Sequence, residues 1–199
     1  FQRQIVAHNI CMVTMTEYEK GMQVHAIAFQ KDFVAMPLCR VLSNHQKRHL
    51  HMAESEKERF PIFFFNGMRE APFDMEERII IPSPKVPTYD LKPEMSSYEL
   101  TEKLLQKINS RAFDFAVMNF ACTDMVGHTG MLGAAIKACE ALDKCLGEIY
   151  RAVLNNGGAL VITADHGNIE QMIDPTTGGP QTEHTSNPVP FVIAAKDLY

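Results

Sequence analysis

The segment from residue 115 to residue 163 constrains the fold more than any other part of the chain. Residues 115–120 form a continuous apolar run with the length and composition of a buried strand. Residues 131–154 follow, and their apolar side chains recur every three or four positions, as on a helix with one buried face. After a stop at Asn156 and Gly157, residues 160–163 form a second apolar run. This order predicts a βαβ unit, and therefore an α/β fold with a mostly parallel sheet buried on both faces.

Shorter patterns predict the elements around this unit. Four further apolar runs are predicted as strands: residues 10–16, 24–29, 62–65 and 190–194. Residues 33–44 predict a helix with Pro37 near its first turn, where proline is tolerated. Two serines offer an N-cap for a helix over residues 98–109. Residues 79–93 hold four prolines and predict an extended, packed loop.

Composition excludes several classes of protein. The net charge of −5 argues against nonspecific nucleic-acid binding, which needs a basic face. The chain shows no signal-peptide pattern, and its apolar runs stay well short of the ~20 residues that a membrane helix requires. Its five cysteines are an odd number without a C-x-x-C pair, which suits a reducing compartment. We therefore expect a cytoplasmic protein with no nucleic-acid or membrane partner.

Acidic and imidazole side chains follow both strands of the predicted βαβ unit. Asp124 comes a few residues after the first strand, and Asp165 and His166 come directly after the second. Because the carboxyl ends of parallel strands meet at one edge of a sheet, we expect these side chains to lie close together. His128 is four residues from Asp124, so a helical turn would put both on one face. His184 lies further on, in a loop rich in glycine and proline.

This set of side chains has the chemistry of a metal site. Mixed carboxylate and imidazole ligands suit Mn²⁺, Zn²⁺, Co²⁺ or iron, and a set without thiolates argues against a structural zinc site. Two divalent ions held together recur in enzymes that transfer phosphoryl groups. Gly127 keeps the space beside His128 open. The pattern therefore predicts a metal site that binds phosphate.

Alternative interpretations apply to each of these residues. An aspartate and a histidine four residues apart are more often a surface pair than metal ligands. His45 and His49 have the same spacing without a strand end or a carboxylate, and we expect a solvated basic face there. Lys57 lies in the charged run 54–59, where a solvated face is favoured over a cation that neutralises phosphate. Cys122 lacks an evident general base, so we expect it to pack in the core.

Several motifs resemble those of the cofactor-independent phosphoglycerate mutases, which are alkaline-phosphatase-like metalloenzymes. They include AESEK, FFFNG, DMVGHTG and TADHGN, and they occur in the family's order over nearly the whole chain. The segments that carry the resemblance are residues 53–57, 63–67, 83–86, 88–90, 93–96, 119–121, 124–130, 163–168, 170–172, 184–185 and 187–190. The resemblance implies the family's three-layer α/β fold with a mostly parallel sheet, incomplete in this chain.

The resemblance also implies an activity and a ligand set. Family members interconvert 3-phosphoglycerate and 2-phosphoglycerate in glycolysis and gluconeogenesis, through a phosphoserine intermediate and with two Mn²⁺ or related ions (Co²⁺, Zn²⁺ or Mg²⁺). By motif, Asp124, His128 and His184 would hold one ion. Asp165 and His166 would hold the other. The full-length enzyme is expected to be a cytoplasmic monomer with phosphoglycerate as its small-molecule substrate.

By resemblance, Lys57 would contact the nucleophilic serine or the phosphate, as a catalytic and substrate-binding residue. The sequence also departs from the family pattern. The family's serine stands in an Asn-Ser-Glu context that none of the serines here reproduces. We therefore expect an internal-to-C-terminal piece: residues 1–31 as the tail of an inserted phosphotransferase domain, and residues 32–199 as a partial metal-binding phosphatase-like domain.

Two alternatives to a mutase remain open. The parent protein could be another metal-dependent phosphomutase or phosphatase of the same superfamily, or a non-catalytic metal-binding module. Without a nucleophile, the chain alone is expected to be inactive, because no phosphoenzyme can form.

Overall fold

The computed structural model describes residues 9–18, 21–30 and 32–196. The chain divides into two compact units, Phe1–Ala35 and Met36–Tyr199. The smaller unit contains β1 (Val13–Thr14) and β2 (Ala26–Ile27), which pair in parallel. The strands predicted over residues 10–16 and 24–29 are thus confirmed over two residues each. Most apolar side chains beside them stay exposed, so longer pairing would bury little surface.

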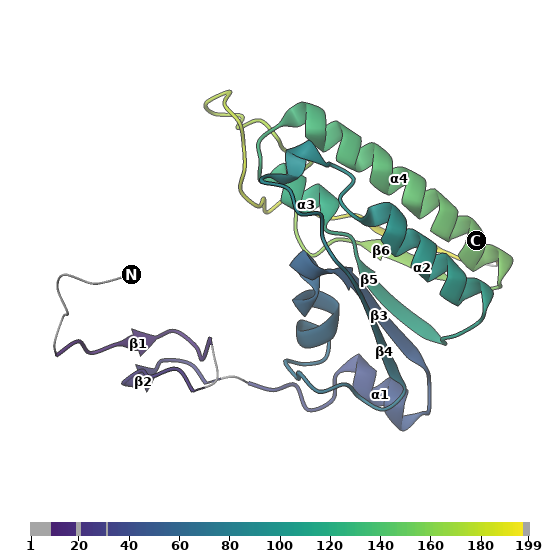
Figure 1. Cartoon of the computed structure of the whole chain (residues 1–199), viewed down its shortest axis with the longest axis horizontal. Helices are drawn as coiled ribbons and strands as arrows, with labels where there is room; N and C mark the ends of the chain where they lie inside the picture. The colour runs from purple at the N-terminus through teal and green to yellow at the C-terminus, as the bar shows by residue number, and fades with distance from the viewer. Residues whose placement is uncertain (1–8, 19–20, 31, 197–199) are drawn as a thin grey trace. The chain divides into compact units, whose positions relative to one another are not determined.

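The larger unit is built around a parallel sheet with the strand order β4-β3-β5 (Figure 1). Its strands are β3 (His49–Glu54), β4 (Glu76–Ile81) and β5 (Phe115–Asn119). All six residues of the central strand β3 are buried, as expected for a strand that is covered on both faces. The predicted α/β class and its parallel sheet are therefore confirmed.

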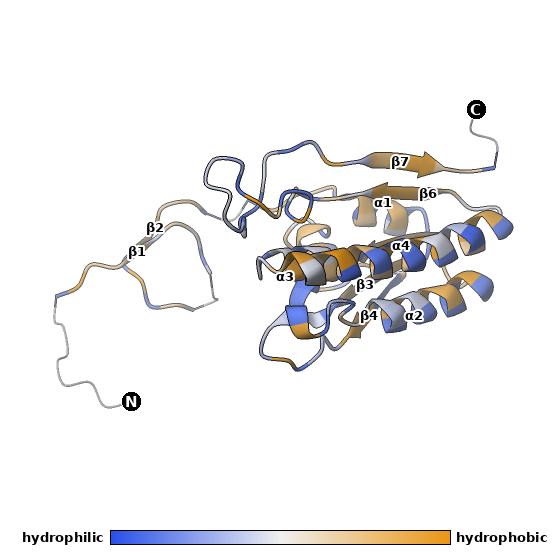
Figure 2. Ribbon diagram, turned by 90° about the horizontal axis from the view of Figure 1, so that it is seen from above, coloured by the Kyte–Doolittle hydropathy of each residue, from blue (hydrophilic) through white to orange (hydrophobic). Residues whose placement is uncertain are grey.

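Helices cover both faces of this sheet, which gives three layers (Figure 1). On one face, α2 (Ser97–Asn109) and α4 (Leu132–Asn155) pack against β3. Figure 2 shows hydrophobic and hydrophilic residues interspersed along the length of both helices, as expected for a helix with one buried face. The core of this layer comprises Leu50, Met52, Ile81, Leu100, Leu104, Ile108 and Ile149. Burying each large apolar side chain contributes roughly 1.5–3 kcal/mol.

The other face of the sheet carries α1 (Leu38–Asn44) and the π-helical segment η2 (Phe60–Phe64). The helix predicted over residues 33–44 begins only after Pro37, because the residue before a proline avoids helical backbone angles. The strand predicted over residues 62–65 is wrong, since this run lies in η2 and the turn after it. A short apolar run does not distinguish a strand from a helix, and Pro61 at the start of η2 favours the helix.

The sequence signals missed the central strand. His49 is only 1% exposed at the start of β3, so the predicted solvated basic face is wrong for His49, although His45 is exposed. The strand escaped prediction because its buried face carries histidines instead of apolar residues. The predicted loop over residues 79–93 is also partly wrong: it begins within β4, and the short 3₁₀ turn η3 (Tyr89–Leu91) interrupts it.

The last two strands lie outside the parallel sheet. The predicted strand β6 (Leu160–Thr163) is confirmed, but it pairs antiparallel with β7 (Phe191–Ala194) and not with β5. Residues 115–163 therefore do not form the predicted βαβ unit within one sheet. Composition identifies a strand, whereas its partner depends on which backbone edge lies beside it in space. Among the described helices, none combines the length and apolarity needed to cross a membrane.

Candidate metal centre

The candidate site is built from four segments, three of which follow strands. The 3₁₀ turn η1 (Ser55–Lys57) follows β3, and α3 (Cys122–Gly127) follows β5 after two residues. The loop after β6 carries Asp165 and His166, and His184 lies in a later loop. A bridge joins the last two segments, because the Thr185 amide donates to the Gly167 carbonyl at 2.9 Å. Segments far apart in sequence therefore meet near the carboxyl end of the parallel sheet.

The Asp124 carboxylate is the centre of this site. Its Oδ1 accepts a hydrogen bond from Asn168 Nδ2 at 2.7 Å. The same oxygen lies 3.1 Å from His184 Nε2 and 3.2 Å from His128 Nε2. Its Oδ2 accepts a hydrogen bond from Lys57 Nζ at 2.5 Å. One nearly buried carboxylate thus contacts two imidazoles, an amide and an ammonium group.

These contacts keep Asp124 ionised. Burial by itself would raise the pKa of Asp124, but hydrogen bonds from Lys57 and Asn168 and the positive charge of Lys57 hold this pKa below its ordinary value. The carboxylate therefore carries its charge at neutral pH, as a metal ligand must.

The orientation of His128 suits metal binding. Its Nδ1 lies 2.6 Å from the carbonyl oxygen of Thr182, which only accepts, so Nδ1 carries the proton. In the neutral ring Nε2 then presents a lone pair toward Asp124, and it lies 3.1 Å from His184 Nε2. Metal-ligating histidines typically hold their outer nitrogen on a carbonyl or carboxylate in this way.

His166 and Asp165 lie at different depths in the site. The His166 ring stacks on the His184 ring, with centroids 3.7 Å apart and an interplanar angle of 23°. Ligand atoms of Asp124, His166 and His184 all lie within 4.8 Å of one another. Asp165 is exposed, and its Oδ1 lies 3.6 Å from His166 Nε2. The structure thus gathers the imidazoles around Asp124, whereas Asp165 contacts His166 and is itself exposed.

Lys57 is not part of a solvated charge run. The residue is 9% exposed, pairs with Asp124, and places its Nζ 4.8 Å from the ring centroid of Phe60. The sequence favoured a solvated face because charged residues surround Lys57 on both sides. The turn η1 instead directs this side chain inward, which leaves its neighbours Glu56 and Glu58 exposed.

Asn168 was missed as a site residue. Besides its contact with Asp124, its backbone amide donates to Glu170 at 2.6 Å. Its side chain occupies the space next to Gly127, where an added Cβ would lie 2.8 Å from Asn168 Cγ. The space that we expected to be open beside His128 is therefore filled by this amide. The Gly-Asn pair directly after Asp165-His166 is the signal that could have identified it.

The donor set fits a divalent transition metal. Two imidazoles direct nitrogen atoms at one ionised carboxylate oxygen, and a third imidazole stacks beside them. Oxygen and nitrogen donors of this kind suit Mn²⁺, Co²⁺ or Zn²⁺. The buried cation Lys57 next to them could hold a phosphate oxygen.

Comparisons with known proteins agree with this chemistry. A model of the metalloenzyme superfamily matches residues 26–199. A protein of Chloroflexus aggregans named 2,3-bisphosphoglycerate-independent phosphoglycerate mutase is 55% identical over 190 residues, which cover 96% of this chain and 35% of that protein. A protein of Clostridium novyi with the same name is 49% identical over 197 residues, which cover 99% of this chain and 38% of that protein.

A solved structure of a phosphoglycerate mutase also resembles this chain. A crystal structure of Leishmania mexicana phosphoglycerate mutase at low cobalt concentration matches with a TM-score of 0.84 and 29% identity, over 94% of this chain and 36% of that one. The chain thus spans little more than a third of the length of these relatives. It belongs to the metalloenzyme superfamily, and within it the chain matches part of the 2,3-bisphosphoglycerate-independent phosphoglycerate mutases, as its motifs predict.

Proposed function

We propose that this chain forms the metal-binding part of an isomerase that interconverts 3-phosphoglycerate and 2-phosphoglycerate. The observation that carries the proposal is the Asp124 carboxylate, which His128, His184 and Lys57 surround at the carboxyl edge of the sheet. The similarity to mutases from Chloroflexus and Clostridium supports phosphoglycerate as the substrate.

Each site residue has a role in this proposal. Asp124, His128 and His184 hold one divalent ion, and Asp165 and His166 hold the other. Mn²⁺ is the proposed metal, with Co²⁺, Zn²⁺ and Mg²⁺ as alternatives; the cobalt named for the Leishmania structure supports this group of ions. The ions supply positive charge that activates a serine hydroxyl and neutralises the transferred phosphoryl group.

Lys57 acts as a catalytic and substrate-binding residue in the proposal. Its ammonium group is already inside the site, where a fixed cation lowers the energy of a phosphoryl group in transfer. Asn168 keeps the Asp124 carboxylate oriented through its hydrogen bond to Oδ1. Both side chains belong to this chain, and both contact Asp124 without phosphate present.

The nucleophile is proposed to come from outside this chain. None of its serines stands in the family's Asn-Ser-Glu context, so the chain alone is expected to form no phosphoserine. We place the boundary between the tail of a phosphotransferase domain and the phosphatase-like domain near residue 31. The division of the structure between Ala35 and Met36 supports a boundary in this region. The free state of all five cysteines supports a cytoplasmic location, and we propose that the full-length protein is a monomer.

Turnover of the full-length protein tests the proposal. With Mn²⁺ present, it should convert 3-phosphoglycerate to 2-phosphoglycerate, measured by coupling the product to enolase. Asp165→Ala should abolish this conversion and leave the circular-dichroism spectrum unchanged. Hydrolysis of phosphate esters without isomerisation would instead identify another phosphatase of the superfamily. Metal binding without either reaction would identify a non-catalytic module.

A further inference from the structure

A second cluster of metal-ligating side chains lies at the amino end of β3. It comprises Cys39 of α1 with His49 and His51 of β3, none of which is more than 1% exposed. Their ligand atoms all lie within 4.8 Å of one another. The candidate metal centre belongs to the other end of the strand, because Lys57 follows the carboxyl end of β3. The two clusters are therefore separate.

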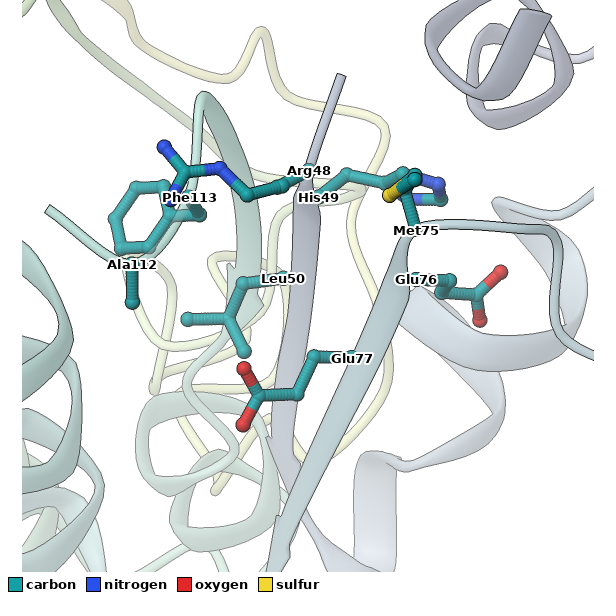
Figure 3. Close-up of a pocket in the computed structure, with 8 residues that line it drawn as sticks. All are labelled: Arg48, His49, Leu50, Met75, Glu76, Glu77, Ala112 and Phe113. Atoms are coloured by element: carbon teal, nitrogen blue, oxygen red, sulfur yellow. The ribbon is translucent and has the colours of Figure 1, made fainter. Parts of the chain in front are cut away.

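The alternation of β3 explains why the two histidines share one environment. Side chains at alternate positions of a strand point to opposite faces of the sheet. Leu50 and Met52 point into the core under α2 and α4, so His49 and His51 point to the face that carries α1. Figure 3 shows this directly, with His49 extending from β3 on the opposite side from Leu50.

Hydrogen bonds determine which nitrogen of each histidine carries a proton. Ser43 Oγ donates to the Asp74 carbonyl oxygen at 2.5 Å, so this hydroxyl accepts from His49 Nε2 at 3.2 Å. His49 Nε2 also lies 3.3 Å from the Asp74 oxygen itself. His51 Nδ1 lies 2.6 Å from the Pro61 carbonyl oxygen. Because a carbonyl oxygen only accepts, the outer nitrogen of each ring must be the protonated one.

The inner nitrogens therefore both present lone pairs. A neutral imidazole carries one proton, and the outer nitrogens already hold it. His49 Nδ1 and His51 Nε2 nevertheless lie 2.9 Å apart, which is a hydrogen-bond distance between two acceptors. Two facing lone pairs in a buried site repel each other unless a positive charge lies with them. Cys39 Sγ lies 3.7 Å from the same His51 nitrogen.

We propose that Cys39, His49 and His51 bind a borderline-soft transition-metal ion, and specifically Zn²⁺, which takes imidazole nitrogen and thiolate sulfur as ligands and undergoes no redox change. On binding, the ion replaces the Cys39 thiol proton, which leaves to solvent, and no oxidation or reduction takes place. The outer nitrogens keep the carbonyl and hydroxyl contacts that metal-ligating histidines normally have. The ion would tie α1 to the central strand, independently of any phosphoryl transfer at the other end of the sheet.

Cobalt substitution tests this site apart from the candidate metal centre. The full-length protein is loaded with Co²⁺, whose bond to a thiolate gives a near-ultraviolet charge-transfer band that oxygen and nitrogen ligands do not give. The wild-type protein should show this band and bind one more Zn²⁺ per chain than Cys39→Ser, measured by mass spectrometry of the metal content. Asp124→Asn should keep the band, because the candidate metal centre contains no sulfur.

Two further variants make the test decisive. Cys145→Ser alters an equally buried cysteine outside the cluster and should keep both the band and the Zn²⁺ content. His51→Gln should remove the band while leaving Cys39 in place, which covers the case in which Cys39→Ser does not fold. X-ray absorption of the cobalt-loaded wild-type protein should show sulfur among the ligands. A wild-type protein without sulfur bound to cobalt, or equal effects of Cys39→Ser and Cys145→Ser, would overturn the proposal.

Discussion

The contact between Gly127 and Asn168 leads to the sharpest prediction for the candidate metal centre. In Gly127→Ala, the added Cβ would lie 2.8 Å from Asn168 Cγ and closer still to its Oδ1, so the amide must move. Asn168 holds the Asp124 carboxylate through a hydrogen bond of 2.7 Å. The substitution should therefore disturb a proposed metal ligand without altering any of the proposed ligands themselves. Gly133→Ala is the matched control, because nothing lies within 4 Å of its added Cβ in α4.

The structure sets the size of the effect. Replacing a helical glycine by alanine stabilises a helix by up to about 1 kcal/mol, and Gly133→Ala should show this gain. In Gly127→Ala, the loss of a hydrogen bond to a charged group costs about 1.5–3 kcal/mol and outweighs that gain. We expect a net destabilisation of about 0.5–2 kcal/mol. Loss of an outer contact of a metal ligand should also weaken metal binding about 10–100-fold.

Two measurements check these values. Urea unfolding of both variants gives the change in free energy of unfolding without metal, and calorimetric titration with Mn²⁺ gives the affinity. Gly133→Ala should be as stable as the wild type or more so, with unchanged Mn²⁺ affinity. If Gly127→Ala matches its control in both measurements, then Asn168 does not position Asp124 and the reasoning is refuted.

Three further predictions concern the buried charges and the core. Lys57→Met should destabilise the metal-free protein by about 3 kcal/mol in urea unfolding, because it leaves the Asp124 charge without its buried partner; adding Asp124→Asn should recover much of this loss, and no recovery would argue against the pair. Burial raises the pKa of Glu54 to about 6, so stability should fall by up to about 2 kcal/mol as pH rises from 4.5 through 6. Glu54→Gln should flatten this pH profile, and an unchanged slope would assign it to other groups. Leu100→Ala in the core should cost about 2–5 kcal/mol, whereas the exposed Leu91→Ala should cost little; similar losses would contradict the assigned packing.

Local patterns were sufficient for the elements that bury one clear apolar stripe. The helices α2 and α4 and the strands β5 and β6 lie within a residue or two of their predicted bounds, because their side chains repeat with the period of the element. The strand β3 was missed because His49 and His51 replace apolar residues on its second buried face. Hydrogen bonds to neighbouring segments compensate that burial, and such partners are not visible in a local pattern.

The residues of the candidate site also fall into two groups: those that local sequence patterns identify and those that depend on tertiary packing. Strand ends identified Asp124, Asp165 and His166 as candidates, and helical spacing and a later loop added His128 and His184. The structure gathers the three histidines around the Asp124 carboxylate, while Asp165 stays exposed. The burial of Lys57 depends on the turn η1. The charged residues around Lys57 in the sequence predict an exposed segment instead. The pairing of β6 with β7 likewise depends on which edges meet in space.

Periodicity and short motifs are local properties, and they were enough to predict the α/β class, the family and most residues of the candidate metal centre. Three contacts became apparent from the three-dimensional packing alone: Lys57 is buried against Asp124, Asn168 fills the space at Gly127, and Cys39 lies beside two histidines. Each of these contacts joins residues from different elements. Their proximity depends on how the layers pack, and no spacing along the chain encodes it.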